Sequence, residues 1–203
     1  MRSNQTEPSK WGSLALVSYI PDPLGAFLHS LQELLPGEHN PRPHVTILPP
    51  RPLQTAVETA SREAKGILQE FKSFDVELLR VRCFAETNIL YLDVGEGEGL
   101  LRALHGALNA RELAHAERFE FLPHLSLGGP IPDGSLVDAR QQAESVWRSA
   151  TCPARFHLSE VVCLWSPPAS VWGNWQRVWS QSLAVGSPTA RKVASAGITA
   201  QTY

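Results

Sequence analysis

The sequence predicts an α+β fold made of two pseudo-symmetric α/β lobes. Segments with strand character alternate with segments of helical periodicity, and the order strand-helix-strand-helix-strand occurs twice. Corresponding elements of the two halves lie about 80 residues apart. A chain of 203 residues is long enough to bury a substantial core in this way. We expect one bilobal domain over residues 1–185, with lobe one at about 11–85 and lobe two at about 88–185.

The first half opens with an apolar, β-rich segment that ends at Pro21-Asp22-Pro23. Leucines and Phe27 then recur at helical spacing until Pro36-Gly37 closes the pattern. Prolines on both sides of His44 exclude a helix interior there, so this stretch is expected to be a short strand. The elements of this half are expected at 13–20, 24–35, 44–48, 57–71 and 74–84.

The second half repeats the order of elements with different side chains. Its strands are expected at 89–94, 119–127 and 156–165, and its helices at about 100–108 and 135–147. A proline-rich loop then leads to a strand over 172–184, whose residues Trp172, Trp175 and Trp179 are interpreted as packing or edge residues. The tail at 186–203 lacks apolar periodicity and is predicted to be disordered.

The composition is that of an ordinary globular protein and excludes several classes. The net charge is −2 and the pI is near 6.4, which argues against bulk electrostatic binding to long nucleic acids. The three cysteines have no CxxC spacing, so we expect reduced thiols and neither a disulfide framework nor a thiolate zinc site. The polar N-terminus and the short apolar run after it predict no signal peptide and no membrane span, and hence a cytoplasmic protein.

Two tripeptides, His44-Val45-Thr46 and His124-Leu125-Ser126, repeat one chemical pattern 80 residues apart, and each follows a proline. On a strand, residues i and i+2 project to the same face, so each histidine shares a face with a hydroxyl. Two such pairs offer two proton-transfer groups and two neutral hydrogen-bond donors to one anionic ligand. The pattern is typical of a phosphodiester site.

A third tripeptide of this type, His157-Leu158-Ser159, does not occupy the repeated position and is interpreted as structural or solvent-facing. A zinc site built from His44 and His124 with Asp93 or His157 is the main chemical competitor. It is disfavoured because no HxH or HxxxH spacing is present and because the hydroxyls beside the histidines would have no role.

The two motifs, each between a proline and an aliphatic residue, resemble those of the two-histidine (2H) phosphoesterase superfamily, and within it the 2′-5′ RNA ligase-like or cyclic phosphodiesterase group. The resemblance in element order covers about residues 14–184. It implies two lobes, each with an antiparallel-rich sheet, two helices and one motif on a central strand, and a catalytic groove between the lobes. It also implies catalysis by His44, Thr46, His124 and Ser126, without a metal or another cofactor.

The activity that this resemblance implies is a metal-independent phosphodiesterase of the EC 3.1.4 type, acting on 2′,3′-cyclic phosphates of RNA ends or small nucleotides. One neutral imidazole acts as general base and one protonated imidazole as general acid. Opening to a 2′-phosphate makes His124 the base and His44 the acid. The partner is a nucleotide or RNA terminus bearing a cyclic phosphate, and the protein is expected to be a monomer. A hydrolase of 2′-5′-linked or cyclic oligonucleotide signals and a non-catalytic module that binds RNA ends remain alternatives.

The sequence departs from the family pattern after the second motif. Many relatives carry an arginine there, and this chain has Gly128-Gly129-Pro130. Cationic help for the phosphate must therefore come from another position. The candidate substrate-binding residues are Arg42, Arg51 and Arg82, with Arg80 as a further candidate arginine and with Phe84, which either stacks on a base or packs in the core.

Overall fold

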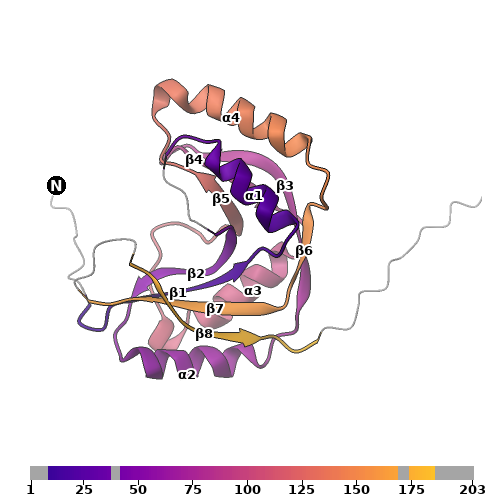
Figure 1. Cartoon of the computed structure of the whole chain (residues 1–203). Helices are drawn as coiled ribbons and strands as arrows, with labels where there is room; N and C mark the ends of the chain where they lie inside the picture. Colours follow the sequence, from indigo (N-terminus) through magenta and orange to yellow (C-terminus); the bar gives the residue numbers. More distant parts are fainter. Residues whose placement is uncertain (1–8, 38–41, 169–173, 186–203) are drawn as a thin grey trace, which may run out of the picture.

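The structure is a computed structural model, and it describes residues 9–37, 42–168 and 174–185. The elements follow one another as a repeated strand-helix-strand-helix-strand series, which confirms the predicted order (Figure 1). They are β1 (Ser13–Tyr19), α1 (Leu24–Glu33), β2 (His44–Pro52), α2 (Val57–Leu68), β3 (Phe74–Phe84), β4 (Ile89–Val94), α3 (Glu98–Leu108), the 3₁₀ turn η1 (Arg111–Leu113), β5 (His124–Gly128), α4 (Asp133–Arg148), β6 (Arg155–Leu158), β7 (Glu160–Ser166) and β8 (Gln176–Ser182).

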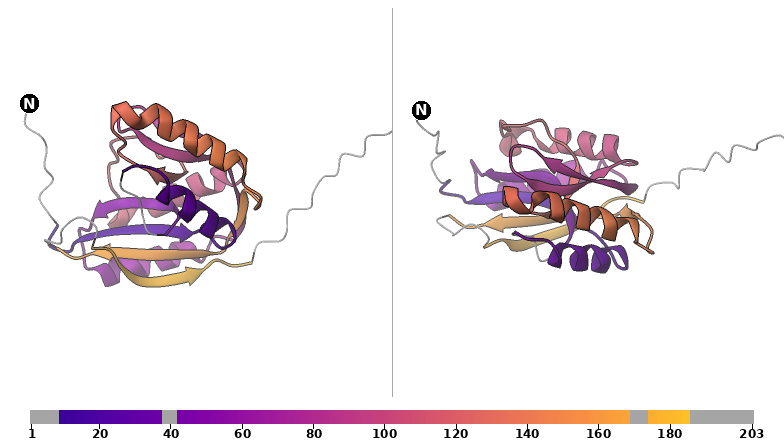
Figure 2. Two further views of the ribbon diagram at one scale, coloured as in Figure 1. Left: turned by 45° about the horizontal axis from the view of Figure 1, so that its top comes forward. Right: turned by 90° about the horizontal axis from the view of Figure 1, so that it is seen from above.

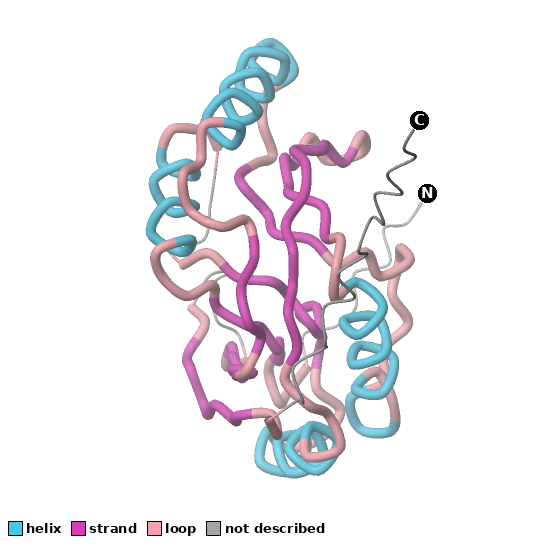
Figure 3. Tube along the Cα trace, turned by 90° about the vertical axis from the view of Figure 1, so that its right-hand side faces the viewer, coloured by secondary structure: helices cyan, strands magenta, loops and turns pink. Residues whose placement is uncertain are grey.

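The strands form two four-stranded sheets, and all strand pairs within them are antiparallel. The first sheet has the order β2-β1-β7-β8, and the second has the order β5-β4-β3-β6. The strands run through the centre of the molecule and the helices lie at its periphery (Figure 3). The expected α+β class, with an antiparallel sheet in each lobe, is confirmed.

The two sheets do not follow the expected division into lobe one at about 11–85 and lobe two at about 88–185. The strand β3 was expected in lobe one, but it pairs with β4 and β6 in the second sheet. Conversely, β7 and β8 from the second half complete the first sheet, where β7 pairs with β1. The hairpin between β3 and β4 explains the first exchange, because a tight turn places consecutive antiparallel strands side by side. Each sheet is therefore built from both halves of the chain.

The helices that precede the two motif strands are exchanged as well. The helix α1, which leads to β2 of the first sheet, packs against α4 and β5. The helix α3, which leads to β5 of the second sheet, packs against α2 and β2. Figures 1 and 2 show α1 beside α4, away from α2. The motif strand β5 therefore contacts α1 from the first half of the chain, and the motif strand β2 contacts α3 from the second half.

Three strand predictions need correction. The segment 119–127 is a strand only from His124 onward, since Pro123 has no N–H with which to join a ladder. The segment 156–165 is two strands in different sheets, and between them the Ser159 carbonyl accepts a hydrogen bond from the Leu183 N–H. The motif strands β2 and β5 are edge strands of their sheets, where central strands were expected. The predicted disordered tail 186–203 and Trp172 lie outside the described residues.

One continuous apolar core joins the two sheets and the helices. It includes the leucine stripe of α1 and the inward-facing residues of both motif strands. The three cysteines are free thiols, and burial raises the pKa of Cys163 to about 12, so this thiol stays protonated at neutral pH. Within the described ranges, none of the helices combines the length and the apolar character that crossing a bilayer requires.

Candidate active site

The two histidine motifs lie on neighbouring edge strands. β2 and β5 contact each other although they belong to different sheets. In each motif the histidine and the hydroxyl residue are partly exposed, while the residues between and after them, Val45, Ile47, Leu125 and Leu127, are fully buried. The predicted alternation is therefore present in both strands, and it leaves His44 and Thr46 on one strand and His124 and Ser126 on the other accessible to a ligand.

Both imidazoles are held by the same main-chain contact. His44 Nδ1 lies 2.9 Å from the carbonyl oxygen of Arg42, and His124 Nδ1 lies 2.7 Å from that of Leu122. Because a carbonyl oxygen only accepts, Nδ1 carries a proton in both rings. Neither Nε2 atom bonds to a residue in the described part of the chain. In each ring, Nε2 is therefore the atom that can give or take a proton.

The electrostatic environment lowers the pKa of both histidines. For His44, burial is the largest cause, the Arg42 carbonyl opposes it, and the nearby charge of His124 lowers the pKa further. For His124, burial lowers the pKa and the Leu122 carbonyl opposes the change. A proton on His124 therefore disfavours a proton on His44, which agrees with the contact between β2 and β5.

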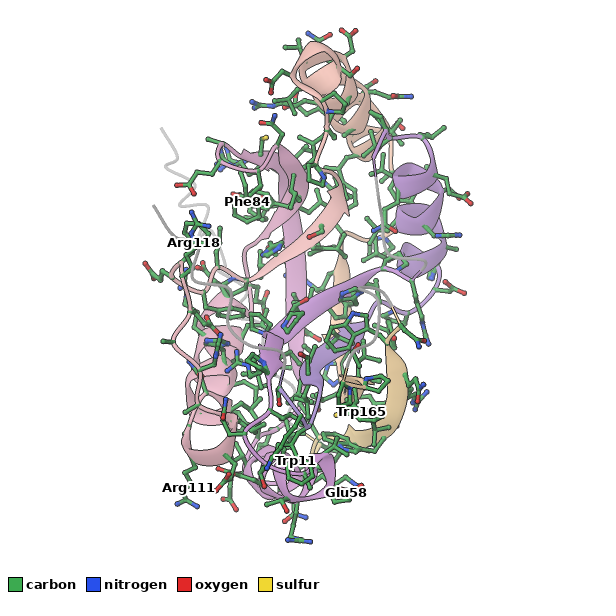
Figure 4. All side chains as sticks on the ribbon, turned by 90° about the vertical axis from the view of Figure 1, so that its left-hand side faces the viewer. Trp11, Glu58, Phe84, Arg111, Arg118 and Trp165 are labelled. Atoms are coloured by element: carbon green, nitrogen blue, oxygen red, sulfur yellow. The ribbon has the colours of Figure 1, made fainter. Side chains whose placement is uncertain are left out.

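Aromatic rings contact both histidines edge-on, one at His44 and two at His124. The Tyr19 ring is 6.0 Å from His44, and the rings of Phe84 and Tyr91 are 5.0 and 5.5 Å from His124, all in edge-on arrangements. Phe84 and Tyr91 also stack on each other at 4.0 Å. Figure 4 shows Phe84 in the upper half of the molecule, away from Trp11 and Trp165 in the lower half. Phe84 thus belongs to the surroundings of His124, and its expected contact with a base remains a prediction.

Tyr19 and Tyr91 were not among the predicted site residues. Tyr19 lies directly opposite His44 in the pairing of β1 with β2, and Tyr91 lies directly opposite Ser126 in the pairing of β4 with β5. Directly paired residues of adjacent strands project to the same face. Only the strand pairing shows that the two tyrosines lie beside the motif residues. The local sequence around either tyrosine does not indicate this position.

Two buried side chains connect the motif strands to the exchanged helices. Gln32 of α1 donates through Nε2 to the Ser126 carbonyl at 2.9 Å, and the Nδ1 of His105 in α3 donates to the Ile47 carbonyl at 2.9 Å. Both side chains are nearly inaccessible, with exposed fractions of 2% and 7%. The free edge of each motif strand is thereby fixed by a helix from the other half. Sequence reasoning missed both residues because each looks like an isolated polar residue in an apolar stripe.

The candidate arginines have different surroundings. Arg42 is exposed, and its guanidinium carbon lies 4.0 Å from the centre of the Tyr19 ring, which itself touches His44. Arg82 donates from Nε to Asp93 Oδ2 at 3.3 Å. The side chain of Asp93 also accepts a hydrogen bond from the main-chain N–H of Arg80. Arg42 and Arg82 thus lie next to the two histidines, and their contact with a substrate stays a prediction.

Arg51 was predicted as a substrate-binding residue, and its burial and internal hydrogen bonds argue against that role. Its exposed fraction is 2%, and its donors are used by Pro49 O, Asn109 Oδ1, Leu113 O and Glu117 Oε1. Glu117 in turn lies 3.3 Å from His105 Nε2. The guanidinium therefore organises the interior around β2 and α3, and four of its five N–H groups are used within the protein. Burial of a charged side chain at a proline-rich strand end is not visible in the local sequence.

The position where the family resemblance implies an arginine is Gly129, and the backbone there disfavours any side chain. Gly129 has a φ of +131°, and a Cβ atom there would lie 2.9 Å from both the Asn88 carbonyl oxygen and the Ile89 Cα. Both the backbone conformation and the space favour glycine. The missing arginine after Ser126 is thus a property of the backbone path and not a simple exchange of side chains.

The third tripeptide lies away from the paired motifs, as predicted. His157 is on β6, at the opposite edge of the second sheet from β5, and its Nδ1 lies 2.8 Å from Asp75 Oδ1 with about half of the side chain exposed. Among the described residues, no three His, Cys, Asp or Glu side chains are grouped so that they could hold a metal ion. His157 therefore does not join His44 and His124 in a common ligand set.

Comparisons of the sequence identify the family. Residues 20–181 match the 2'-5' RNA ligase superfamily. A protein of Geobacillus sp. (strain WCH70) named "Putative phosphoesterase" is 30% identical over 126 residues, which are 57% of this chain and 72% of that protein. A protein of Geobacillus kaustophilus (strain HTA426) with the same name is 28% identical over 120 residues, which are 57% of this chain and 68% of that protein.

Solved structures share the fold. The apo form of E. coli LigT has a TM-score of 0.60 at 12% identity, and E. coli LigT complexed with 3'-AMP has a TM-score of 0.59 at 13% identity. Each comparison covers 87% of this chain and 99% of the other. The family match and the similarity to the named phosphoesterases, together with the paired motifs, place the chain among the two-histidine phosphoesterases. The chain belongs to the 2'-5' RNA ligase superfamily.

Proposed function

We propose that this protein hydrolyses 2′,3′-cyclic phosphates of nucleotides or RNA ends by general acid and base catalysis with His44 and His124, without a metal ion. The observation that carries the proposal is the identical support of the two imidazoles, in which Nδ1 is bound to a carbonyl and Nε2 is left for proton transfer. The 3'-AMP complex of E. coli LigT, a protein with the same fold, is consistent with a nucleotide ligand.

The reaction is an attack of water on phosphorus with loss of a ribose oxygen. In the direction that leaves a 2′-phosphate, His124 Nε2 takes a proton from the attacking water as the new P–O bond forms. The bond from phosphorus to the 3′ oxygen breaks, and His44 Nε2 gives its proton to that oxygen. The hydroxyls of Thr46 and Ser126 donate to the non-bridging oxygens, whose negative charge grows in the transition state.

The experiment measures hydrolysis of a panel of 2′,3′-cyclic nucleotides with the full chain, in the presence of a chelator. We expect His44→Ala and His124→Ala each to lower kcat by about 10²- to 10⁴-fold, because each removes one proton-transfer group. His157→Ala is the matched control, since it removes the histidine of the same tripeptide outside the site and should leave kcat unchanged.

Two results would contradict the proposal. One is hydrolysis that persists in both motif variants, and the other is activity that the chelator abolishes. If the protein binds cyclic phosphates tightly without turning any of them over, it is a binding module. Extending the panel to 2′-5′-linked dimers and cyclic dinucleotides tests whether the same four residues serve a different phosphodiester.

A further inference from the structure

A cleft of about 470 Å³ lies on the second sheet beside His124. Its walls include residues of β3, β4 and the start of α3, and the two residues that precede His124. These wall residues include Arg82, Tyr91, Asp93, Glu98, Leu122 and Pro123. None of the four motif residues contributes to the described wall, so the cleft adjoins the site and is distinct from it.

The strand register places this cleft within reach of a ligand bound at His124. Asp93 is paired directly with His124, and Tyr91 is paired directly with Ser126. Arg82 is paired with Tyr91 on the next strand. Directly paired residues project to the same face of a sheet, so all of these side chains share one face. A phosphate held by His124 and Ser126 would therefore have the remainder of its molecule beside Tyr91, Asp93 and Arg82.

The charges in the cleft are already balanced. Arg82 is paired with Asp93 at 3.3 Å, and Glu98 is paired with Arg102 at 3.0 Å. Because no positive charge is in excess, the cleft does not suit a second phosphate group. Tyr91, Leu122 and Pro123 add apolar surface. A flat, neutral group with a polar edge fits these surroundings, and a nucleobase is such a group.

The Arg82–Asp93 pair presents acceptors next to donors. Asp93 accepts hydrogen bonds from the Arg80 N–H and from Arg82 Nε, and a carboxylate can accept about two more. The Nη groups of Arg82 donate to no residue in the described ranges. Guanine carries two N–H donors, at N1 and N2, next to the O6 acceptor. Uracil has a single N–H between two carbonyl groups, so it cannot supply both donors to one carboxylate.

We propose that this cleft holds the base of the substrate and that Asp93, with Arg82 beside it, makes the protein select guanine. The inference rests on the proposed function, since it assumes that the phosphate of a nucleotide is bound at the motif pair. Asp93 accepts the N1 and N2 protons of guanine, and Arg82 donates to O6. Tyr91 and Pro123 line the space that the base occupies.

The test compares kcat/KM for the 2′,3′-cyclic phosphates of guanosine, adenosine, cytidine and uridine with the full chain. We expect guanosine to be preferred over uridine by about ten- to a hundredfold, the range for a two-bond contact to a base edge. In Asp93→Asn, an amide N–H₂ replaces one acceptor oxygen, so kcat/KM should fall more for guanosine than for uridine and this preference should move toward one. Asp75→Asn is the matched control, because Asp75 is ion-paired with His157 outside the cleft, and it should keep the preference.

The measured quantity is the ratio of kcat/KM for guanosine to kcat/KM for uridine. A general loss of structure lowers both values and therefore cannot imitate the expected result. Equal kcat/KM values for the four bases, or an Asp93→Asn variant that loses activity equally on all four, would overturn the inference and leave the hydrolysis itself standing. If none of the four is hydrolysed, the proposed function fails. Calorimetric binding of guanosine 2′-phosphate against uridine 2′-phosphate then decides the base preference independently, and equal affinities would overturn it.

Discussion

At the residue scale, the two motif histidines have nearly equivalent surroundings. Each Nδ1 is bound to the carbonyl two residues earlier in the chain, each ring has aromatic neighbours at its edge, and burial lowers the pKa of each. This symmetry explains how both rings are oriented but does not distinguish the acid from the base. The assignment of His124 as base and His44 as acid therefore stays a prediction from the family resemblance.

The lowered pKa values predict an acidic optimum. Catalysis needs one imidazole neutral and the other protonated, and this form is most abundant between the two pKa values. Since both lie below the ordinary value of 6.5, we expect a bell-shaped profile of kcat/KM against pH with its maximum below pH 6.5. Above this range both rings lose their protons, and the acid is missing.

The measurement is kcat/KM for a 2′,3′-cyclic nucleotide from pH 4.5 to 8.5. The profile of kcat should lie at higher pH than that of kcat/KM, because a bound phosphate anion favours the protonated imidazoles. A maximum of kcat/KM above pH 7 would contradict the role of burial. Tyr19→Phe serves as the control variant for this pH profile, since it keeps the aromatic ring beside His44.

At the scale of elements, the exchange of α1 and α3 places a polar side chain at the free edge of each motif strand. Edge strands such as β2 and β5 have main-chain groups that no neighbouring strand of their own sheet binds. Gln32 satisfies the Ser126 carbonyl, and His105 satisfies the Ile47 carbonyl. Both carbonyls belong to a motif residue or to its neighbour, so these bonds fix the strands that carry the site.

The variant Gln32→Ala tests this positioning role. We expect the free energy of unfolding to fall by about 1–3 kcal/mol, because the buried Ser126 carbonyl loses its partner. We also expect kcat to fall with little change in KM, because Ser126 and His124 lose their alignment. Urea unfolding and steady-state kinetics measure the two effects.

Gln181→Ala is the control for Gln32, since Gln181 Nε2 donates to the Lys65 carbonyl at 3.1 Å far from the motif strands. This variant should lose stability without losing kcat. If Gln32→Ala behaves in the same way, the bond to Ser126 contributes to stability alone.

At the scale of the whole molecule, a buried polar network joins the two halves of the chain. Arg51 at the end of β2 binds Asn109, Leu113 and Glu117, and Glu117 approaches His105 of α3. The His105 ring also stacks on Phe121 at 3.8 Å, just before the second motif. The network therefore fixes the segment from α3 to β5 against the first sheet.

The variant Arg51→Ala should be strongly destabilised. Removing the guanidinium leaves the Glu117 carboxylate without its charged partner, and breaking a buried pair in this way costs about 3–5 kcal/mol. Arg42→Ala should change the free energy of unfolding by no more than about 0.5 kcal/mol, as is usual at exposed positions. Urea unfolding of both variants makes the comparison, and equal losses would contradict the structural role of Arg51.

Much of the fold could be predicted from local patterns. The predicted bounds of β3 and β4 coincide with those in the structure, and the helices lie where the apolar stripes indicate them. The split of the segment 156–165 at Ser159 was not predictable, because both of its parts are apolar strands. What separates them is the sheet that each one joins, and that depends on contacts with distant residues.

The sequence by itself determined the periodicity of the elements, their order, and the pairing of a histidine with a hydroxyl in two equivalent strands. These features are local, since side-chain spacing along a strand or helix follows from backbone geometry. The tertiary structure alone decided which strands share a sheet, that Arg51 is buried, and that Asp93 and Arg82 lie on the same face as His124. Such contacts join residues far apart in the chain, and they arise only when the whole core is packed.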